Sequence, residues 1–172
     1  MMSLDHAIFY ALLTWLVIVP LLTLLHELGH ACTAIMLTGQ RVVVQMGKRP
    51  GIVRFRLGKI DFHFRPSALP VGFYEMTDWQ RATRQQLAWI ALAGPLTSLL
   101  LMALCAALAI ASYNIDDSLY FLSSGAAFIA LAQFLFSMSP LRYPRWMGSY
   151  AGHWSDGYRS WFLLASKQEE HL

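Results

Sequence analysis

Three long blocks of this chain carry no charged residue, and they constrain its fold more than any other feature. They span residues 7–25, 87–112 and 118–141. A helix needs about 20 mostly apolar residues to cross the hydrocarbon core of a bilayer, so each block is long enough for one transmembrane helix. The composition agrees, because 56% of the 172 residues are hydrophobic and only 13% are charged. The sequence therefore predicts an integral membrane protein and excludes a soluble two-domain enzyme.

The predicted fold is membrane α-helical, with three transmembrane helices and a small membrane-surface β-sheet inserted between helices 1 and 2. We expect one domain over residues 1–172, and its predicted elements in chain order are helix 1 at about 4–37, a strand-rich loop at 40–76, helix 2 at about 80–112, helix 3 at about 118–139 and a C-terminal segment at 140–172. Gly39 suits the end of the first helix, and Pro20 suits a kink within it.

Within the loop, three short segments have the pattern of antiparallel strands, at residues 41–47, 52–57 and 60–65. In the third segment the apolar side chains alternate with polar ones, so we expect one apolar and one polar face. Residues 66–76 suggest irregular structure.

The lysines and arginines predict how the chain is oriented. Nine of the thirteen lie between Arg41 and Arg84 and the other four follow Pro140, whereas the segments that flank the opposite ends of the helices have none. Basic segments favour the cytoplasmic side, so we expect the N-terminus outside and the C-terminus in the cytoplasm, in a bacterial inner (cytoplasmic) membrane. The basic loop fits a role in topology better than nucleic-acid binding, because no aromatic stacking module accompanies it. The expected partner surface is the lipid bilayer, and the oligomeric state stays open.

The acidic and basic side chains inside the first helix form an HExxH motif. Between residues 7 and 37 they are His26, Glu27 and His30, and such residues at membrane depth indicate a functional site. Two histidines four positions apart share one helix face and can bind one cation, for which Zn²⁺ is the best candidate. Glu27 is placed to take a proton from water at that ion. The alternative is that both histidines only form hydrogen bonds between helices, with Glu27 paired to an arginine.

A catalytic zinc site usually has a third protein ligand. The candidates on the expected side of the membrane are His63, Glu75, Asp78, His153, Asp156, Glu169, Glu170 and His171. We favour Asp156, because Gly157 and an apolar run follow it and suggest a turn that opens a short helix. His153 is the rival ligand, or a hydrogen-bond partner of a ligand. An ordinary helix N-cap is an equal alternative role for Asp156.

These motifs resemble the site-2 protease family of intramembrane zinc metalloproteases. The resemblance spans most of the chain and rests on HELGH at 26–30, LPVGFYEM at 69–76, AGPLTS at 93–98 and the late Asp-Gly at 156–157. It implies that His26, His30 and Asp156 bind zinc and that Glu27 is the catalytic base. It also implies a substrate that is itself a transmembrane protein.

The loop containing Gly72 and Phe73 is similar to the family's Pro-x-Gly-Gly-Tyr segment, a re-entrant element near the substrate, with Phe73 in place of the second glycine. Gly94, Pro95 and Ser98 match the family's Ala-Gly-Pro-x-x-Asn, with Ser98 in place of the asparagine. From the residues alone, Gly94 and Pro95 equally indicate close helix packing and a kink.

Residues 137–140 are similar to the family's Asn-x-x-Pro stretch but lack its asparagine. Fifteen residues then separate Pro140 from Asp156, a longer spacer than is usual in the family. The aromatic residues from Tyr143 to Trp161 fit a belt at the membrane interface better than a cage around a substrate.

The sequence thus predicts a zinc-dependent metalloendopeptidase that cleaves a membrane protein in or near a transmembrane segment. The substrate helix would have to open into an extended strand, which could pair with an edge of the loop sheet such as residues 60–65. The alternative is a zinc-binding, non-proteolytic membrane module, either a pseudoprotease that holds a client helix or a metal sensor. A transporter is a weaker alternative, because three helices without a repeat make a pathway hard to draw.

Overall fold

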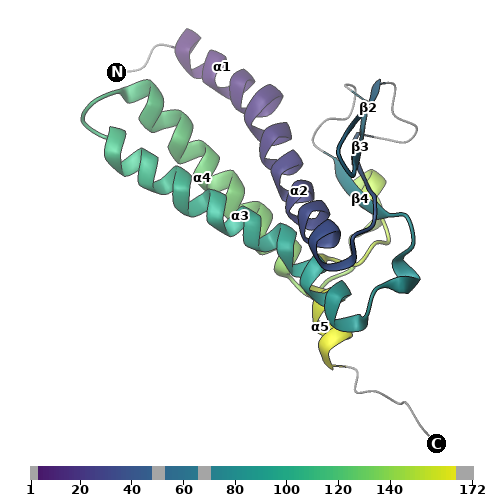
Figure 1. Ribbon diagram of the computed structural model, residues 1–172. Helices are drawn as coiled ribbons and strands as arrows, with labels where there is room; N and C mark the ends of the chain where they lie inside the picture. The colour runs from purple at the N-terminus through teal and green to yellow at the C-terminus, as the bar shows by residue number, and fades with distance from the viewer. Residues whose placement is uncertain (1–3, 48–52, 66–70, 166–172) are drawn as a thin grey trace, which may run out of the picture.

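The first predicted helix is one continuous rod built from three consecutive segments (Figure 1). In the computed structural model, which describes residues 4–47, 53–65 and 71–165, these segments are α1 (Leu4–Leu13), the π-helical turn η1 (Thr14–Ile18) and α2 (Val19–Thr38). Pro20 has no N–H for the helical ladder, and the wider π turn lies directly before it. Gly39 ends α2 with φ 70° and donates its N–H to the Ile35 carbonyl at 2.9 Å, which confirms the predicted stop.

Two further long helices follow, α3 (Arg84–Ser112) and α4 (Asp117–Met138). In the described part of the chain, three helical stretches are long and apolar enough to cross a membrane, as predicted: Ile8–Thr38, Arg84–Ser112 and Asp117–Met138. The second begins at residue 84 and not at 80, because Thr83 caps it in a reciprocal capping box with Gln86. The residues just before this cap form the separate 3₁₀ turn η3 (Trp79–Arg81).

Helix α3 packs along both α2 and α4. The approach of α2 to α3 depends on Gly29, because a Cβ there would lie 2.2 Å from Thr97 Oγ1 and 2.8 Å from the Ala93 carbonyl oxygen. A small residue in this position lets the two backbones come close. As a result, the HExxH face of α2 is pressed against α3.

The loop sheet has four strands where three were predicted, and it is mixed where an antiparallel sheet was expected. Its strands are β1 (Val42–Met46), β2 (Val53–Leu57), β3 (Ile60–Phe64) and β4 (Gly72–Met76), in the spatial order β2-β3-β1-β4. The β2–β3 and β1–β4 pairs are antiparallel, but β1 and β3 are parallel. The interpretation of residues 66–76 as irregular was wrong for β4, because pairing with β1 overrides a local sequence rich in glycine and proline; residues 66–70 lie outside the described part.

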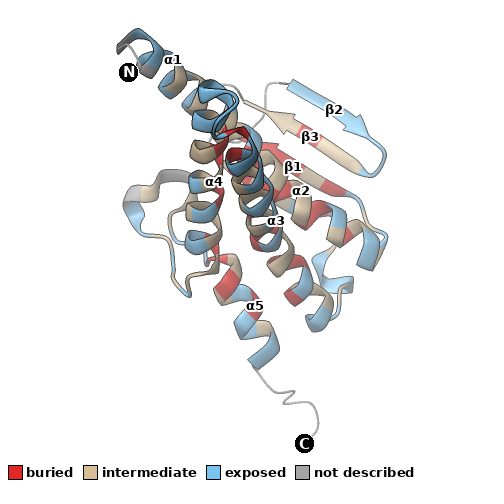
Figure 2. Cartoon of the chain, turned by 90° about the vertical axis from the view of Figure 1, so that its left-hand side faces the viewer, coloured by how far each residue is buried: buried red, intermediate tan, exposed pale blue. Residues whose placement is uncertain are grey.

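The sheet lies beside the second half of α2, in chain order between α2 and α3 (Figure 1). Val42 and Val44 of β1 are fully buried against Ala31 and Ala34 of α2. Figure 2 shows that buried residues gather where α2, α3 and β1 meet, whereas β2 is exposed along its whole length. This core holds the sheet against the helix that carries the HExxH motif.

The two faces predicted for residues 60–65 are present in β3. Phe62 is buried and stacks on Phe55 with ring centroids 4.8 Å apart, whereas Asp61 pairs with Arg56 at the surface. The hydrogen bond from Arg56 holds the pKa of the Asp61 carboxyl below its ordinary value.

The long spacer after α4 folds into a closed loop. Tyr143 donates its N–H to the His153 carbonyl and Gly152 donates to the Tyr143 carbonyl, both at 2.9 Å, and the tip contains the 3₁₀ turn η4 (Arg145–Tyr150). Helix α5 (Asp156–Ala165) follows and packs against α3. This return of the chain brings residue 156 back to α2.

Candidate metal centre

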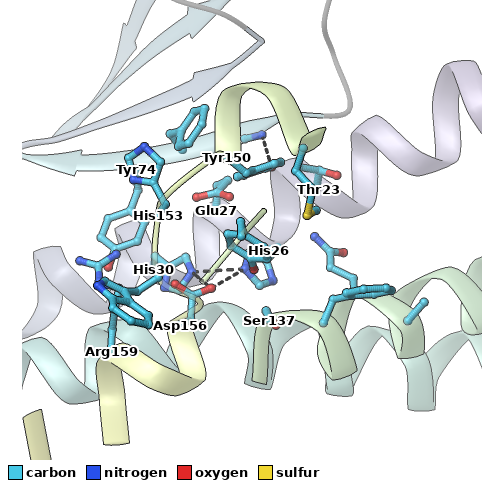
Figure 3. Close-up of a pocket in the computed structure, with 18 of the residues that line it drawn as sticks. Thr23, His26, Glu27, His30, Tyr74, Ser137, Tyr150, His153, Asp156 and Arg159 are labelled. Atoms are coloured by element: carbon cyan, nitrogen blue, oxygen red, sulfur yellow. Dashed lines mark hydrogen bonds and ion pairs between the residues drawn. The ribbon is translucent and has the colours of Figure 1, made fainter. Parts of the chain in front are cut away.

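The imidazole rings of His26 and His30 lie one turn apart on α2, and both side chains are buried. Their Nε2 atoms face each other at 3.3 Å. The Asp156 carboxylate of α5 meets them, with Oδ2 3.4 Å from His26 Nε2 and 3.5 Å from His30 Nε2 (Figure 3). Two residues four apart on one helix and a third 126 positions further along the chain therefore converge on one point.

The outer nitrogen of each ring is held by a group of α3. His30 Nδ1 lies 2.6 Å from the Ile90 carbonyl oxygen, which can only accept, and 3.3 Å from the Gly94 nitrogen. The much shorter contact to the carbonyl favours the proton on Nδ1, which leaves Nε2 with its lone pair. His26 Nδ1 lies 2.8 Å from Ser98 Oγ, and Ser98 is fully buried. Hydrogen bonds of this kind set the tautomer and orientation of metal-binding histidines.

Tyr74 of β4 orients His30 from a second direction. The two rings stack with centroids 4.3 Å apart and an angle of 23° between planes. The Arg159 guanidinium also lies over the tyrosine ring, 5.8 Å from its centroid. Burial raises the pKa of Tyr74 to about 12, so the phenol stays neutral at physiological pH.

Asp156 is free to face the histidines because a neighbouring residue caps its helix. Ser155 Oγ accepts the Tyr158 N–H at 3.2 Å, which is the bond of an N-cap residue. Asp156 is the first residue of α5, so the N-cap alternative for this carboxylate was wrong. Gly157 fits the helix start against α4, since a Cβ there would lie 2.1 Å from the Met138 carbonyl oxygen.

The charge state of Asp156 suits a cation. Burial raises the pKa of its carboxyl, but the attraction and hydrogen bonds of the two imidazoles together lower it by more. The pKa therefore lies well below its ordinary value, and the group is an anion at neutral pH.

The distances among the three facing atoms fit a tetrahedral zinc site. Zinc binds histidine nitrogen and carboxylate oxygen at about 2.0 to 2.2 Å, which gives tetrahedral edges of about 3.3 to 3.6 Å. The three observed edges are 3.3, 3.4 and 3.5 Å. Two imidazole nitrogens and a carboxylate oxygen are also a ligand set typical of catalytic zinc, with the fourth position left for water or substrate.

Gly94 of α3 makes room for this arrangement. A Cβ at this position would lie 2.2 Å from His30 Nε2 and 2.7 Å from His26 Nε2. The glycine therefore lets the α3 backbone pass directly behind both ligands. Pro95, also buried, interrupts the helical hydrogen-bond ladder in the same turn.

Glu27 lies beside the three facing atoms and lines the same cavity (Figure 3). The cavity has a volume of about 590 Å³, and its polar lining includes Thr23, Glu27, Gln133, Tyr150 and Arg159. The Glu27 carbons and Oε1 pack against Gly72 of β4, where a Cβ would lie 2.6 Å from Cγ and 2.9 Å from Oε1. The buried carboxylate thus stands next to the proposed ion with an open space in front of it.

A comparison of the sequence with known protein families agrees with the metal centre described above. The model of peptidase family M50 matches residues 14–159, which include all three candidate ligands and most of the chain. The chain belongs to peptidase family M50. No curated protein and no solved structure matches it significantly. The family is the site-2 protease family, so the resemblance predicted from the motifs is confirmed, and the chain is an integral membrane protein of metallopeptidase type.

The residues that resemble the other M50 motifs differ in which groups of the centre they contact. Gly94 and Ser98 touch the histidines, and Gly72 touches Glu27. Phe73 lines the cavity, where its ring centroid lies 5.1 Å from that of Tyr150 and 5.9 Å from that of His153. His153 lines the cavity but is not one of the three converging residues.

The remaining third-ligand candidates are not part of the described cluster. His63, Glu75 and Asp78 lie in the sheet or just after it, and none belongs to the three converging residues. Glu169, Glu170 and His171 lie outside the described residues.

Sequence reasoning missed three contacts of this M50 centre. The Ile90 carbonyl gives no signal in the sequence, because it is a backbone group and not a side chain. Tyr74 was part of the quoted LPVGFYEM segment but received no role. The contact of Tyr150 could not be seen in the sequence, because its hydroxyl accepts the Gly72 N–H at 2.9 Å across 78 residues of chain.

Proposed function

We propose that this M50 protein is an intramembrane zinc metallopeptidase that hydrolyses a peptide bond in or near a transmembrane segment of a membrane-protein substrate. One observation carries the proposal. Three candidate ligand atoms, spaced like the corners of a tetrahedral zinc site, line the same cavity as the Glu27 carboxylate. A structural zinc site is closed by four protein ligands, whereas a hydrolytic one keeps a position open beside a general base.

The cavity also reaches into the membrane-spanning part of the protein. Apolar residues of α2 and α4 line it, namely Val19, Ile129, Ala132 and Phe136. All four belong to the helices that are long and apolar enough to cross a membrane. A substrate segment entering between α2 and α4 would therefore reach the centre without leaving an apolar environment.

The chain's own residues have distinct parts in the proposed hydrolysis. His26, His30 and Asp156 would hold the zinc ion, which when bound polarises the peptide carbonyl and activates water for attack. Glu27 accepts the proton of the attacking water and then delivers it to the amine of the leaving peptide. Ser98 and the Ile90 carbonyl keep the imidazole lone pairs directed at the ion throughout.

We further propose that the substrate is bound as an extended strand along β4. The sheet has two edges, β2 and β4, and only β4 lines the cavity; β3, at residues 60–64, is an interior strand, so the edge suggested from the sequence was wrong. Gly47 N–H bonds the Val71 carbonyl and Thr77 N–H bonds that of Arg41, so the odd-numbered residues of β4 face β1. Gly72 and Tyr74 therefore direct their backbone groups to the free edge.

Tyr150 occupies part of that edge. Its hydroxyl accepts the Gly72 N–H at 2.9 Å, the bond that a substrate carbonyl would need. A strand that pairs along the whole edge must displace this hydroxyl, so the loop between α4 and α5 would open or shift when substrate binds.

We place the sheet at the cytoplasmic surface of a bacterial inner membrane, with the N-terminus outside. The support is the charge distribution, because nine of the thirteen lysines and arginines lie between Arg41 and Arg84.

The Glu27→Gln variant tests the proposed function. Wild type, Glu27→Gln and a surface control, Asp78→Asn, are purified, assayed for zinc by mass spectrometry, and reconstituted with a panel of labelled single-span peptides. We expect one zinc ion per chain in all three proteins. Cleavage should fall by about 10²- to 10⁴-fold in Glu27→Gln alone, because only this variant lacks the base. Wild-type protein that binds zinc and cleaves no peptide of the panel, or Glu27→Gln with unchanged cleavage, would refute the proposal; the first result would favour a non-proteolytic zinc-binding module.

A further inference from the structure

Apart from the HExxH residues, three polar side chains of the described part of α2 and α4 line the membrane-facing wall of the cavity, and two of them are already hydrogen-bonded. The three are Thr23 of α2 and Gln133 and Ser137 of α4. Thr23 Oγ1 donates to the Val19 carbonyl at 3.0 Å, and Ser137 Oγ donates to the Phe134 carbonyl at 3.1 Å. Both hydroxyls therefore satisfy themselves within their own helices.

Gln133 is different from these two. Among the described residues its carboxamide has no hydrogen-bond partner, although it is half-buried in a helix long and apolar enough to cross a membrane. An amide without a partner in an apolar environment costs free energy, so a polar side chain kept there indicates a ligand that pairs with it. The carboxamide can donate and accept at once, as a peptide group does.

An extended substrate needs such a partner. A strand carries hydrogen-bonding groups along both of its edges, and a bilayer offers no water to satisfy them. The free edge of β4 can pair with one edge of the strand. The other edge requires a polar group on another wall of the same cavity. Apart from the HExxH residues, Gln133 is the polar side chain of α2 and α4 that lines this cavity without a hydrogen-bond partner among the described residues.

We propose that Gln133 binds the main chain of the substrate, pairing its carboxamide with a peptide group on the edge that β4 leaves unpaired. This inference rests on the proposed function, since it assumes an extended peptide in the cavity. It makes Gln133 a substrate-binding residue that supports unwinding of the substrate helix and that is not one of the three converging metal-ligand candidates among the described residues. The substrate class that follows is a transmembrane segment able to unwind locally, recognised through its backbone.

The test measures binding separately from cleavage. Labelled single-span peptides are titrated into zinc-loaded Glu27→Gln protein in vesicles, with and without Gln133→Leu, which keeps a similar side-chain size and removes both hydrogen-bonding functions. Gln85→Leu is the matched control, because Gln85 is exposed at the start of α3 and does not line the cavity. We expect Gln133→Leu to raise the Kd of the peptide about tenfold, because one hydrogen bond is lost and the peptide group is left unpaired. Gln85→Leu should leave the Kd unchanged.

A backbone scan identifies the peptide group involved. Each peptide bond of the labelled peptide is replaced in turn by an ester, which removes one N–H and weakens one carbonyl acceptor. At one position the ester should weaken binding to the protein with Gln133 and have no further effect in Gln133→Leu, since the bond is already absent. Zinc content should be equal in all variants, which separates loss of substrate contact from damage to the metal centre.

The outcomes separate the two proposals. A Kd within twofold of the parent protein, an ester profile identical with and without Gln133, or loss of zinc in Gln133→Leu would overturn the role of Gln133. Binding that depends on Gln133 in a wild-type protein that cleaves none of the peptides would support this inference and refute the peptidase. A protein that neither binds nor cleaves them would overturn both.

Discussion

Gly94→Ala is the substitution whose effect on the metal centre the structure defines most closely. The added Cβ would lie 2.2 Å from His30 Nε2, 2.5 Å from His30 Cε1 and 2.7 Å from His26 Nε2. Ordinary contacts between such atoms begin at about 3.5 Å, so at least one imidazole must move by about 1 Å. Metal sites tolerate deviations of about 0.2 Å in ligand distance. The movement would also break the bonds from the rings to Ser98 and to the Ile90 carbonyl.

We therefore expect Gly94→Ala to lower zinc affinity by more than the roughly 10- to 100-fold that follows loss of a hydrogen-bond partner of a ligand. Overpacking at this helix contact should also lower the free energy of unfolding by about 1–3 kcal/mol. Zinc affinity is measured by competition with a chelator of known Kd, and unfolding by thermal denaturation in detergent.

Gly125→Ala is the matched control for this experiment. Gly125 is in α4, and a Cβ there would have no atom within 4 Å, so the same change should leave zinc affinity intact and raise helix stability by up to about 1 kcal/mol. A Gly94→Ala protein that binds zinc with wild-type affinity would refute the packing argument, because the histidines could then not occupy the positions described.

Three further predictions concern the residues around the centre. Asp156→Ala should abolish stoichiometric zinc binding while His153→Ala retains it, because Asp156 is the described carboxylate that meets both imidazoles; metal analysis of the purified variants checks this, and the reverse result would make His153 the third ligand. Ser98→Ala should weaken zinc binding by about 10- to 100-fold by freeing His26 Nδ1, as measured by chelator competition, and an unchanged affinity would show that the hydroxyl does not orient the ring. Tyr150→Phe should raise kcat/KM several-fold in the peptide assay, because the Gly72 N–H becomes available to substrate, whereas a fall would show that the hydroxyl supports the active arrangement.

Much of this fold could be predicted from the chain because helices in a bilayer must satisfy their own backbone groups. The long uncharged blocks, the stop at Gly39 and the HExxH spacing each act within a few turns of one helix. Strand β4 could not be predicted in the same way. Its five residues combine the strand-favouring Phe73 and Tyr74 with Gly72 and Glu75, which strands disfavour, and β1 supplies their hydrogen bonds from about 30 positions earlier in the chain.

The parallel pairing of β1 with β3 was missed for a related reason. Local patterns show which residues alternate, but they do not show which strand lies beside which. The edge proposed for substrate pairing changed accordingly from residues 60–65 to β4.

The amino-acid sequence by itself determined the membrane class and the position of the HExxH pair, because these follow from hydrophobicity and helical periodicity. It favoured Asp156 as the third ligand but left His153 open, and the packing of α5 brought Asp156 to the histidines. Only the tertiary structure decided that Ser155 and not Asp156 caps α5, that Ser98 holds His26, and that Tyr150 covers Gly72. The contacts of Ser98 and Tyr150 join residues from different elements. Ser155 and Asp156 are neighbours that cap helices equally well, so the sequence does not show which of them is the cap. The geometry of these contacts exists only once α2, α3, α5 and the sheet are packed together, so no local property of the chain contains it.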